Sequence, residues 1–343
     1  MATIKDVARM TGLSLATISK YLNGGHVLDE NRLSIETAIA DLGYSVNKMA
    51  RGLKTHRSMT VGVLIPDLEN VFITSIISSF ENILHHSGYS TIICDYKHDA
   101  TLERAKFDFL AGRQIDGLVL MPLSGCRDGI RRLQARQIPV VLIDRPVPDL
   151  PCDAVLVRNE QASFDAVTAL ILAGHRRIGV ICGPPGVYTA DERLKGYMRA
   201  LVEHGLAVDP VLIRYGRYDT DSGFQLTREL IHADPRPTAL FVTNHEMTLG
   251  SVLALHAVRI EIPGQLSIVG FDNQMLATVH QPILATVVQP LRQIGENAAR
   301  LILRRMRGDQ TGFPDICLLD TTWMPGASIA GPPRIEAESK IHL

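Results

Sequence analysis

Apolar side chains recur at helical spacing from the start of the chain. The first helix is predicted to begin at Thr3, which is followed three positions later by an acidic residue, and to end at Gly12. Its apolar positions follow the i, i+3, i+4 pattern of an amphipathic helix and are Ile4, Val7 and Ala8.

A second helix is predicted to follow, capped by Ser14 and stopped by the glycine-rich residues 23–25. Its apolar residues Ile18 and Leu22 are expected to face inward. The face expected to point outward carries Leu15, Ala16, Ser19 and Lys20.

A third helix is predicted over about residues 30–42, with Gly43 at its end. Its inward positions are Leu33 or Ile35, followed by Ile39 and Leu42. Two short helices around a glycine-containing turn, braced by a third, form a helix-turn-helix.

From Thr60 onward the pattern changes to short apolar runs rich in Val and Ile, separated by helical segments. Continuous apolar strands that alternate with helices indicate parallel sheets covered on both faces. About 270 residues of such doubly wound α/β units normally split into two subdomains. The predicted strands are Val61–Ile65, Thr91–Cys94, Gly117–Met121, Val140–Ile143, Ala154–Val157, Ile178–Cys182, Ala239–Val242 and Leu266–Phe271.

The charge of the chain is unevenly distributed. Over 343 residues, 35 Lys+Arg nearly balance 36 Asp+Glu and the net charge is −1. Residues 1–57 nevertheless carry a net charge of +3, which leaves −4 for the rest. A small basic head is typical of nucleic-acid binding, since phosphate neutralisation supplies most non-specific affinity, but a solvated basic face fits the same count.

Several classes of protein are disfavoured by composition and motifs. No apolar stretch approaches a membrane span and the first residues show no signal region, so we expect a soluble, cytoplasmic chain. The five Cys lie far apart, without a CxxC pair, and most are expected to be buried thiols. No phosphate loop, dinucleotide fingerprint, zinc-protease pair or nucleophile elbow occurs, so we expect no enzyme, metal or cofactor.

The head resembles that of the lactose/galactose-repressor (LacI/GalR) family. The resemblance rests on a long gapless string that includes Thr3–Ala8, Gly12–Ser14, Ala16–Ser19, Leu22-Asn23 and Leu42–Tyr44. It implies a small all-α helix-turn-helix head joined to an α/β periplasmic-binding-protein-like body of two doubly wound parallel-sheet lobes.

In this family the second helix enters the DNA major groove, so the resemblance assigns base contacts to Leu15, Ala16 and Lys20. The first two offer only van der Waals contact, whereas Lys20 can donate to guanine O6 or N7. Short donors around the same helix are suited to phosphates and are Ser14, Thr17, Ser19 and Asn23. For Thr17 and Ser19, a role as cap or surface hydroxyls is the alternative.

The basic stretch after Tyr44 is too short to be a stable helix by itself. It resembles the family's hinge helix, which folds on the operator, pairs with its dimer mate and inserts a leucine into the minor groove. Leu53 matches that leucine and Ala50 its packing neighbour, with Asn47 and Lys54 in the same segment. A plain linker is the alternative.

The body resembles the family's two lobes joined by three crossovers, with ligand in the cleft between them. The implied divisions are a head over 1–46, a hinge over 47–58, a first lobe over 59–158 and 288–317, a second lobe over 159–287 and 318–330, and a flexible tail over 331–343. In open α/β sheets, ligands bind beyond the carboxyl ends of the strands.

In the first lobe the candidate effector residues follow two strands. Asp67, Asn70 and Phe72 resemble a family loop, although Val71 stands where that loop has proline. Asp144 and Arg145 follow another strand, and a carboxylate beside a guanidinium can hold sugar hydroxyls or an acid. Helix capping by Asn70, core packing by Phe72 and a surface Asp144–Arg145 pair are the alternatives.

In the second lobe Arg193, Asn244 and Asp272 match positions that face the family's cleft. His245 stands where the family has aspartate, and a titrating imidazole there can make effector affinity depend on pH near about 6–7. A purely structural role for His245 is the alternative. These side chains favour a polar effector such as a sugar or sugar acid.

The resemblance therefore predicts a ligand-responsive repressor that binds a palindromic operator as a homodimer, associated with the nucleoid in the cytoplasm and not with a membrane. The lactose repressor's tetramer-forming helix has no counterpart here, because the last residues show no apolar heptads. A body of the same fold that senses a purine or a protein partner is the alternative, whereas a transport binding protein is disfavoured by the head.

Overall fold

The computed structural model describes residues 2–22, 24–44, 57–123, 125–272 and 274–333. The chain divides into two compact units, residues 1–59 and 60–343, which we describe separately. Within the described ranges, every helix is too short or too polar to cross a bilayer.

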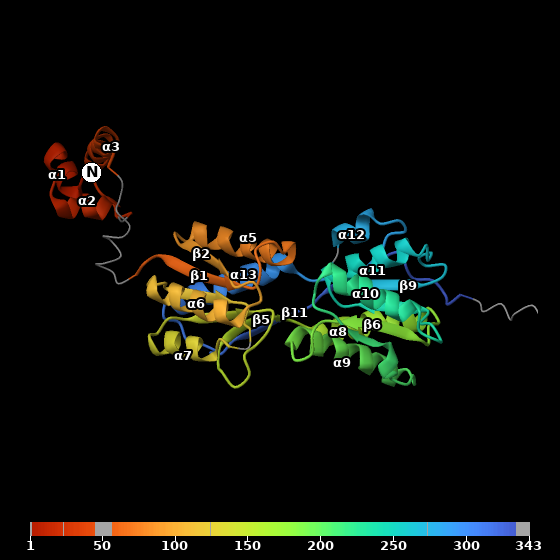
Figure 1. Ribbon diagram of the computed structural model, residues 1–343. Coiled ribbons are helices and arrows are strands. Elements are labelled where there is room, and N and C mark those ends of the chain that lie inside the picture. Colours follow the sequence, from red (N-terminus) through yellow and green to blue (C-terminus); the bar gives the residue numbers. More distant parts are fainter. Residues whose placement is uncertain (1, 23, 45–56, 124, 273, 334–343) are drawn as a thin grey trace, which may run out of the picture. The chain divides into compact units, whose positions relative to one another are not determined.

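The head consists of α1 (Ile4–Thr11), α2 (Leu15–Leu22) and α3 (Asp29–Leu42) (Figure 1). The first helix begins at Thr3, whose N–H and hydroxyl both donate to the Asp6 carboxylate, and ends at Gly12 with φ 68°. The left-handed backbone at Gly12 explains why glycine stands there. The predicted boundaries of α1 are confirmed.

The small core of the head is built from one or two side chains of each helix: Val7, Ile18, Ile35 and Ala38. Of the two alternatives for α3, Ile35 is buried whereas Leu33 is 67 % exposed. Ile39 and Leu42 pack against this core and are partly buried.

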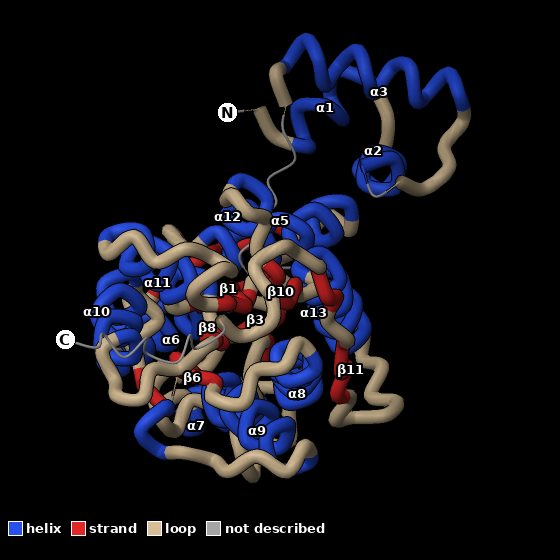
Figure 2. Tube along the Cα trace, turned by 90° about the vertical axis from the view of Figure 1, so that its right-hand side faces the viewer, coloured by secondary structure: helices blue, strands red, loops and turns tan. Residues whose placement is uncertain are grey.

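The first sheet of the body has the order β11-β5-β4-β3-β1-β2, and all its pairs are parallel. Its strands are β1 (Thr60–Ile65), β2 (Ser90–Asp95), β3 (Gly117–Leu120), β4 (Val140–Ile143), β5 (Asp153–Val157) and β11 (Ile316–Leu319). Its helices are α5 (Val71–His86), α6 (Ala100–Gly112), α7 (Arg127–Ala135) and α13 (Leu291–Met306). The pairs α5 with α13 and α6 with α7 pack together, so helices cover the sheet on both sides (Figure 2).

The second sheet has the order β12-β10-β9-β8-β6-β7, in which only β12 runs antiparallel to its neighbour. Its strands are β6 (Ile178–Cys182), β7 (Ile213–Tyr215), β8 (Ala239–Val242), β9 (Ser267–Phe271), β10 (Ala285–Val288) and β12 (Thr322–Met324). Its helices are α8 (Asn159–Leu172), α9 (Tyr188–Glu203), α10 (Thr220–Ile231), α11 (His245–Ala257), α12 (Gln274–Val279) and the short 3₁₀ helix η1 (Pro210–Leu212).

The eight apolar runs all form strands, and the strands β7, β10, β11 and β12 were not predicted. Three of these four, β7, β11 and β12, lie at sheet edges and contain only exposed and partly buried side chains, so they show no continuous buried apolar run. Four of the five Cys are buried and Cys317 is partly buried, as expected.

The chain passes between the two sheets after β5, after β10 and after β11. The crossings expected at 287–288 and 317–318 lie slightly later, since β10 continues to Val288 and β11 pairs with β5 as far as Leu319. Residues 334–343, most of the segment expected to be flexible, lie outside the described residues.

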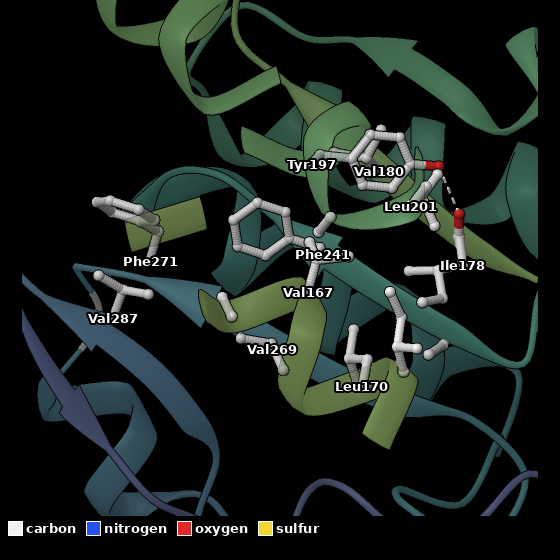
Figure 3. Close-up of a cluster of buried hydrophobic side chains, with 14 of the residues drawn as sticks. Val167, Leu170, Ile178, Val180, Tyr197, Leu201, Phe241, Val269, Phe271 and Val287 are labelled. Atoms are coloured by element: carbon white, nitrogen blue, oxygen red, sulfur yellow. Dashed lines mark hydrogen bonds between the residues drawn. The ribbon is translucent and has the colours of Figure 1, made fainter. Parts of the chain in front are cut away.

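A buried cluster binds α8 and α9 to the second sheet (Figure 3). Phe241, Phe271 and Tyr197 are its largest side chains, and the Tyr197 hydroxyl donates to the carbonyl of Ile178 at 2.8 Å. Burial of such rings is the main source of stability for a core of this kind. This packing fixes the start of α8 and the middle of α9, from which two site residues project.

Close packing of α9 on α8 generates a prediction. A Cβ at Gly196 would lie 2.1 Å from the carbonyl oxygen of Glu160 in α8. We expect Gly196→Ala to lower the free energy of unfolding by about 1–3 kcal/mol through overpacking. Urea denaturation measures this change. Gly112→Ala is the control, because nothing lies within 4 Å of its added Cβ; equal stability of the two variants would contradict the close approach.

Candidate functional site

The outward face of α2 presents the side chains predicted to contact bases. Leu15 is 45 % exposed, Ala16 and Lys20 are also exposed, and Ile18 on the opposite face is fully buried. The predicted division between an inward and an outward face is therefore confirmed for these four residues, whereas Ser19, expected to point outward, is partly buried.

The hydroxyls near α2 are partly used by the head itself. Ser14 Oγ accepts the N–H of Thr17 at 3.1 Å, so Ser14 caps α2, and the two hydroxyls lie 2.9 Å apart. Thr17 and Ser19 are partly buried. Asn23 and the hinge residues Asn47, Ala50, Leu53 and Lys54 lie outside the described residues.

A polar link that was not predicted holds α2 against α3. The Tyr21 hydroxyl and the Arg32 Nε–H both donate to Glu36 Oε1, each at 2.9 Å. Both hydrogen bonds lower the pKa of Glu36. Together with the small apolar core, these hydrogen bonds fix the orientation of α2 relative to α3.

In the body, Asp144 and Arg145 follow β4 directly. The Arg145 Nε–H donates to Asp144 Oδ2 at 2.9 Å. The Arg145 side chain is only 18 % exposed and the Asp144 side chain only 10 %. The alternative of a surface ion pair is therefore wrong. Burial alone lowers the pKa of Arg145, but Asp144 and Tyr96 outweigh it and the pKa is raised.

Two polar side chains of the loop after β1 accept hydrogen bonds from nearby backbone N–H groups. Asn70 Oδ1 accepts the N–H of Phe72 at 2.9 Å and caps α5, as the alternative interpretation held. Asp67 accepts the N–H of Glu69 at 2.9 Å and lies 3.4 Å from Lys97 Nζ. Phe72 is partly buried, and α5 starts at Val71 despite the missing proline.

Arg193 is held in the second lobe by four groups from three elements. Its Nε–H donates to Asn159 Oδ1 at 2.8 Å, its Nη1–H donates to the carbonyl of Thr243 at 2.6 Å, and Nη2 lies 3.8 Å from Asp272 Oδ2. The guanidinium also lies 3.8 Å above the centre of the Phe271 ring. The side chain is 5 % exposed.

Asp272 follows β9 with a left-handed backbone of φ 63°. Its Oδ2 accepts the Gln289 Nε2–H at 2.5 Å, whereas Oδ1 is buried without a hydrogen-bond partner among the described residues. Burial raises the pKa of the carboxyl to about 6, against the opposing effects of Arg193 and Gln289, and Asp144 raises it further. A buried acceptor of this kind costs folding free energy unless a donor reaches it.

Asn244 and His245 form the start of α11. Asn244 Oδ1 accepts the N–H of Met247 at 2.9 Å, so this side chain caps the helix. His245 Nδ1 lies 3.3 Å from the carbonyl oxygen of Asp272, which can only accept, so Nδ1 carries a hydrogen. This bond supports the structural alternative for His245.

Two tyrosines that were not predicted interact electrostatically across the two lobes. Tyr188 and Tyr218 of the second lobe both interact electrostatically with Asp144 of the first. The Tyr218 ring lies directly over Gly183, where an added Cβ would come within 2.1 Å of it. Burial raises the pKa of both hydroxyls, so both stay neutral donors at neutral pH.

A buried carboxyl in the first lobe was also not predicted. Glu103 is 1 % exposed, its Oε1 accepts the N–H of Leu123 at 2.7 Å, and its Oε2 has no hydrogen-bond partner among the described residues. Burial raises its pKa, and it interacts electrostatically with Arg145.

Electrostatic interactions join one polar cluster, of which four members follow strands, whereas Tyr188 and Arg193 lie on α9. It contains Asp144 and Arg145 from the first lobe, and Tyr188, Arg193, Tyr218 and Asp272 from the second. Asp67, Asn70, Phe72 and Asn244 are not joined to this cluster by a hydrogen bond or ion pair among those the structure describes.

Two family models match the chain. "Bacterial regulatory proteins, lacI family" matches residues 3–47, and "Periplasmic binding protein-like domain" matches residues 167–329. Among curated relatives, Catabolite control protein A of Priestia megaterium is 36 % identical over 311 residues, covering 89 % of this chain and 92 % of the relative. The HTH-type transcriptional repressor CytR of Escherichia coli strain K12 is 34 % identical, covering 91 % and 92 %.

Solved structures show the same architecture. A transcriptional regulator CelR–cellobiose complex is 28 % identical with a TM-score of 0.73, covering 96 % of this chain and 100 % of the other. The lac repressor dimer bound to operator and the anti-inducer ONPF has a TM-score of 0.85 at 24 % identity, covering 96 % of this chain and 99 % of the other. This similarity shows that the two chains share a fold. The chain therefore belongs to the LacI family of bacterial transcriptional repressors, which are DNA-binding regulators with an effector-binding body rather than enzymes.

Proposed function

We propose that this repressor binds a palindromic operator as a homodimer in the cytoplasm, at the nucleoid, and that a small polyhydroxylated effector between the lobes changes its affinity for DNA. The observation that carries the proposal is the buried, unpartnered Oδ1 of Asp272, which lies in a cluster with Arg193 and interacts with Asp144 of the other lobe.

The donors and acceptors of the cluster support a donor-rich effector. Arg193 already gives two N–H groups to Asn159 and Thr243, whereas Asp272 keeps an oxygen free of partners among the described residues. An ionised carboxyl of this kind repels a phosphate or carboxylate and accepts from hydroxyls. We therefore favour a neutral sugar over a sugar acid, in line with the cellobiose complex of a structural relative.

A purine or nucleoside is the second candidate. Tyr188 and Tyr218 both interact electrostatically with Asp144, and an aromatic ring suits a base as well as a sugar face. Repressors named PurR, 32 % identical in Vibrio atlanticus, are among the relatives. A body that senses a protein partner remains a further alternative to either ligand.

On the DNA side, we propose that Lys20 reads a base pair, that Leu15 and Ala16 contact base edges, and that Ser14, Thr17, Ser19 and Asn23 bind phosphates. The exposure of the first three supports this assignment. Since Ser14 caps α2, its hydroxyl can donate to a phosphate while it accepts the Thr17 N–H. We assign Leu53, with Asn47, Ala50 and Lys54, to a minor-groove hinge.

Exposed apolar side chains support the homodimer. They lie on and shortly after α12 and around the start of α5, and they are between 42 % and 79 % exposed: Leu68, Val71, Met275, Val279 and Ile283. Figures 1 and 2 place α5 and α12 along the same edge of the body. An apolar surface of this kind is typical of an interface, here with a second copy of the chain.

The effector proposal predicts a ligand whose affinity depends on Asp272. We expect a thermal-shift screen of sugars, sugar acids and nucleosides to find a stabilising ligand that also changes operator affinity about 5–150-fold. The same ligand should bind Asp272→Asn at least about tenfold more weakly, because the amide offers one acceptor fewer. Asp128→Asn, an exposed carboxylate on α7, is the control.

The pKa of about 6 fixes the pH dependence of this affinity. A donor ligand needs the ionised carboxylate, so its affinity should fall about tenfold per pH unit below pH 6 in the parent and stay level in Asp272→Asn. Because the pKa of Asp272 is raised in the folded protein, its ionisation lowers the folding stability as pH rises from about 4 to 6. Asn cannot ionise, so without ligand Asp272→Asn should be more stable than the parent at pH 7.5. A flat profile in the parent would exclude Asp272 from the site.

Base recognition by Lys20 makes a separate prediction. Lys20→Ala should reduce discrimination at one base pair of the operator half-site by about 1–3 kcal/mol. Competition binding against every single-base operator variant measures it. Lys5→Ala removes the same charge from an exposed position on α1 and should weaken binding evenly; an unchanged preference in Lys20→Ala at every position would exclude the contact.

The hinge assignment predicts that Leu53→Ala weakens specific binding by the loss of an apolar wedge worth about a few kcal/mol, with effector affinity nearly unchanged. Fluorescence anisotropy with operator and with scrambled DNA measures both affinities. Leu33→Ala removes a leucine that is 67 % exposed in the head and is the matched control. Parent-like operator affinity in Leu53→Ala would remove the wedge from the proposal.

A further inference from the structure

Two histidines in the second lobe lie close together, away from the site described above. His256 is the second-last residue of α11, and His280 follows the end of α12. Their Nε2 atoms lie 3.2 Å apart, and the ring planes differ by 25°. Both line a surface depression of about 580 Å³.

The hydrogen on His280 is fixed by its other nitrogen. Nδ1 lies 2.7 Å from the carbonyl oxygen of Pro282, and a carbonyl can only accept, so Nδ1 carries the hydrogen. In the neutral ring the Nε2 lone pair of His280 is then free to accept, and His256 Nε2–H donates to it. A backbone carbonyl that holds the far nitrogen of a histidine is also the usual support of a metal-binding imidazole.

The distance between the two nitrogens suits a shared metal ion. With Zn–N bonds of about 2.0–2.1 Å, two nitrogens 3.2 Å apart subtend an angle of about 100° at the metal, close to tetrahedral. Ring planes 25° apart allow both lone pairs to lie near one plane. The metal replaces the hydrogen between the rings, and that hydrogen moves to Nδ1 of His256, so that both rings stay neutral.

We propose that His256 and His280 form a binding site for a divalent transition-metal ion of the zinc, nickel and copper class. The described residues place no third His, Cys, Asp or Glu in position to bind, so water fills the other coordination sites. Two charged groups line the same depression, Glu261, which favours a cation, and Arg259, which opposes one. The ion ties the end of α11 to the end of α12.

Isothermal titration of the full-length, tag-free, chelator-stripped protein with Zn²⁺ and Cu²⁺ tests the proposal. We expect one equivalent to bind, with Cu²⁺ tighter than Zn²⁺, and binding to weaken as pH falls from 7.5 to 5.5 because protons compete for the nitrogens. Bound Cu²⁺ should show an electron paramagnetic resonance spectrum with coupling to two nitrogens.

The variants distinguish this site from casual surface binding. His256→Gln and His280→Gln should each weaken binding at least about tenfold. His280 is buried, and its replacement could impair folding. His256 is exposed, so His256→Gln is expected to fold and by itself tests the site. His232→Gln, at another helix end, should leave binding within about twofold of the parent. Binding that is absent in the parent, or unchanged in His256→Gln, would overturn the proposal.

Discussion

The arrangement of the body depends on the buried guanidinium of Arg193 and on the groups that replace its lost hydration. Removing a charge from water is costly unless hydrogen bonds and an opposite charge replace the lost hydration. Arg193 obtains this from the start of α8, the end of β8 and the end of β9, through Asn159, the Thr243 carbonyl, and Phe271 with Asp272. One arginine therefore fixes the carboxyl ends of two strands relative to two helices. The compensation is incomplete, because Asp272 Oδ1 is left without a partner among the described residues. In the proposed function, a donor group of the effector completes it.

Several residues that follow the strands near this site also have an unusual, left-handed backbone conformation. Asp144, Tyr218 and Asp272 all have φ between 63° and 72°, a region that side-chain-bearing residues rarely occupy. All three lie directly after or close to a strand end: Tyr218 and Asp272 precede α10 and α12, whereas Asp144 lies between β4 and β5. Such conformations cost of order 1–3 kcal/mol each and persist where the surroundings hold them in place, commonly at binding sites. The hydrogen bond from the Asp272 N–H to the Val287 carbonyl, at 2.8 Å, is one such restraint.

Sequence patterns predicted what depends on local periodicity and missed what depends on contacts between distant segments. Central strands such as Val140–Ile143 are continuous apolar runs because both faces of the sheet are covered, and the outward and inward faces of α2 follow from helical spacing. Tyr218 follows β7, a three-residue edge strand without an apolar run, so nothing marked the turn that carries it. Glu103 sits in a charged helical stretch and resembles a solvated residue until the fold buries it. Asn70 and Asn244 were expected to contact the ligand, and the structure adds that each caps a helix, for which an Asn before an apolar helix was the signal available in the sequence.

The division of the cluster between the lobes determines whether a ligand can regulate anything. A ligand shifts a conformational equilibrium only by the difference between its affinities for the two states. If all its contacts lay in one lobe, it would bind open and closed arrangements equally and leave the affinity for DNA unchanged. The cluster avoids this, since Asp144 and Arg145 belong to the first lobe and Tyr218, Arg193 and Asp272 to the second. An effector bound as proposed contacts both sides, so its affinity would depend on the spacing of the lobes, and a difference of about 1–3 kcal/mol would suffice for a 5–150-fold change at the operator.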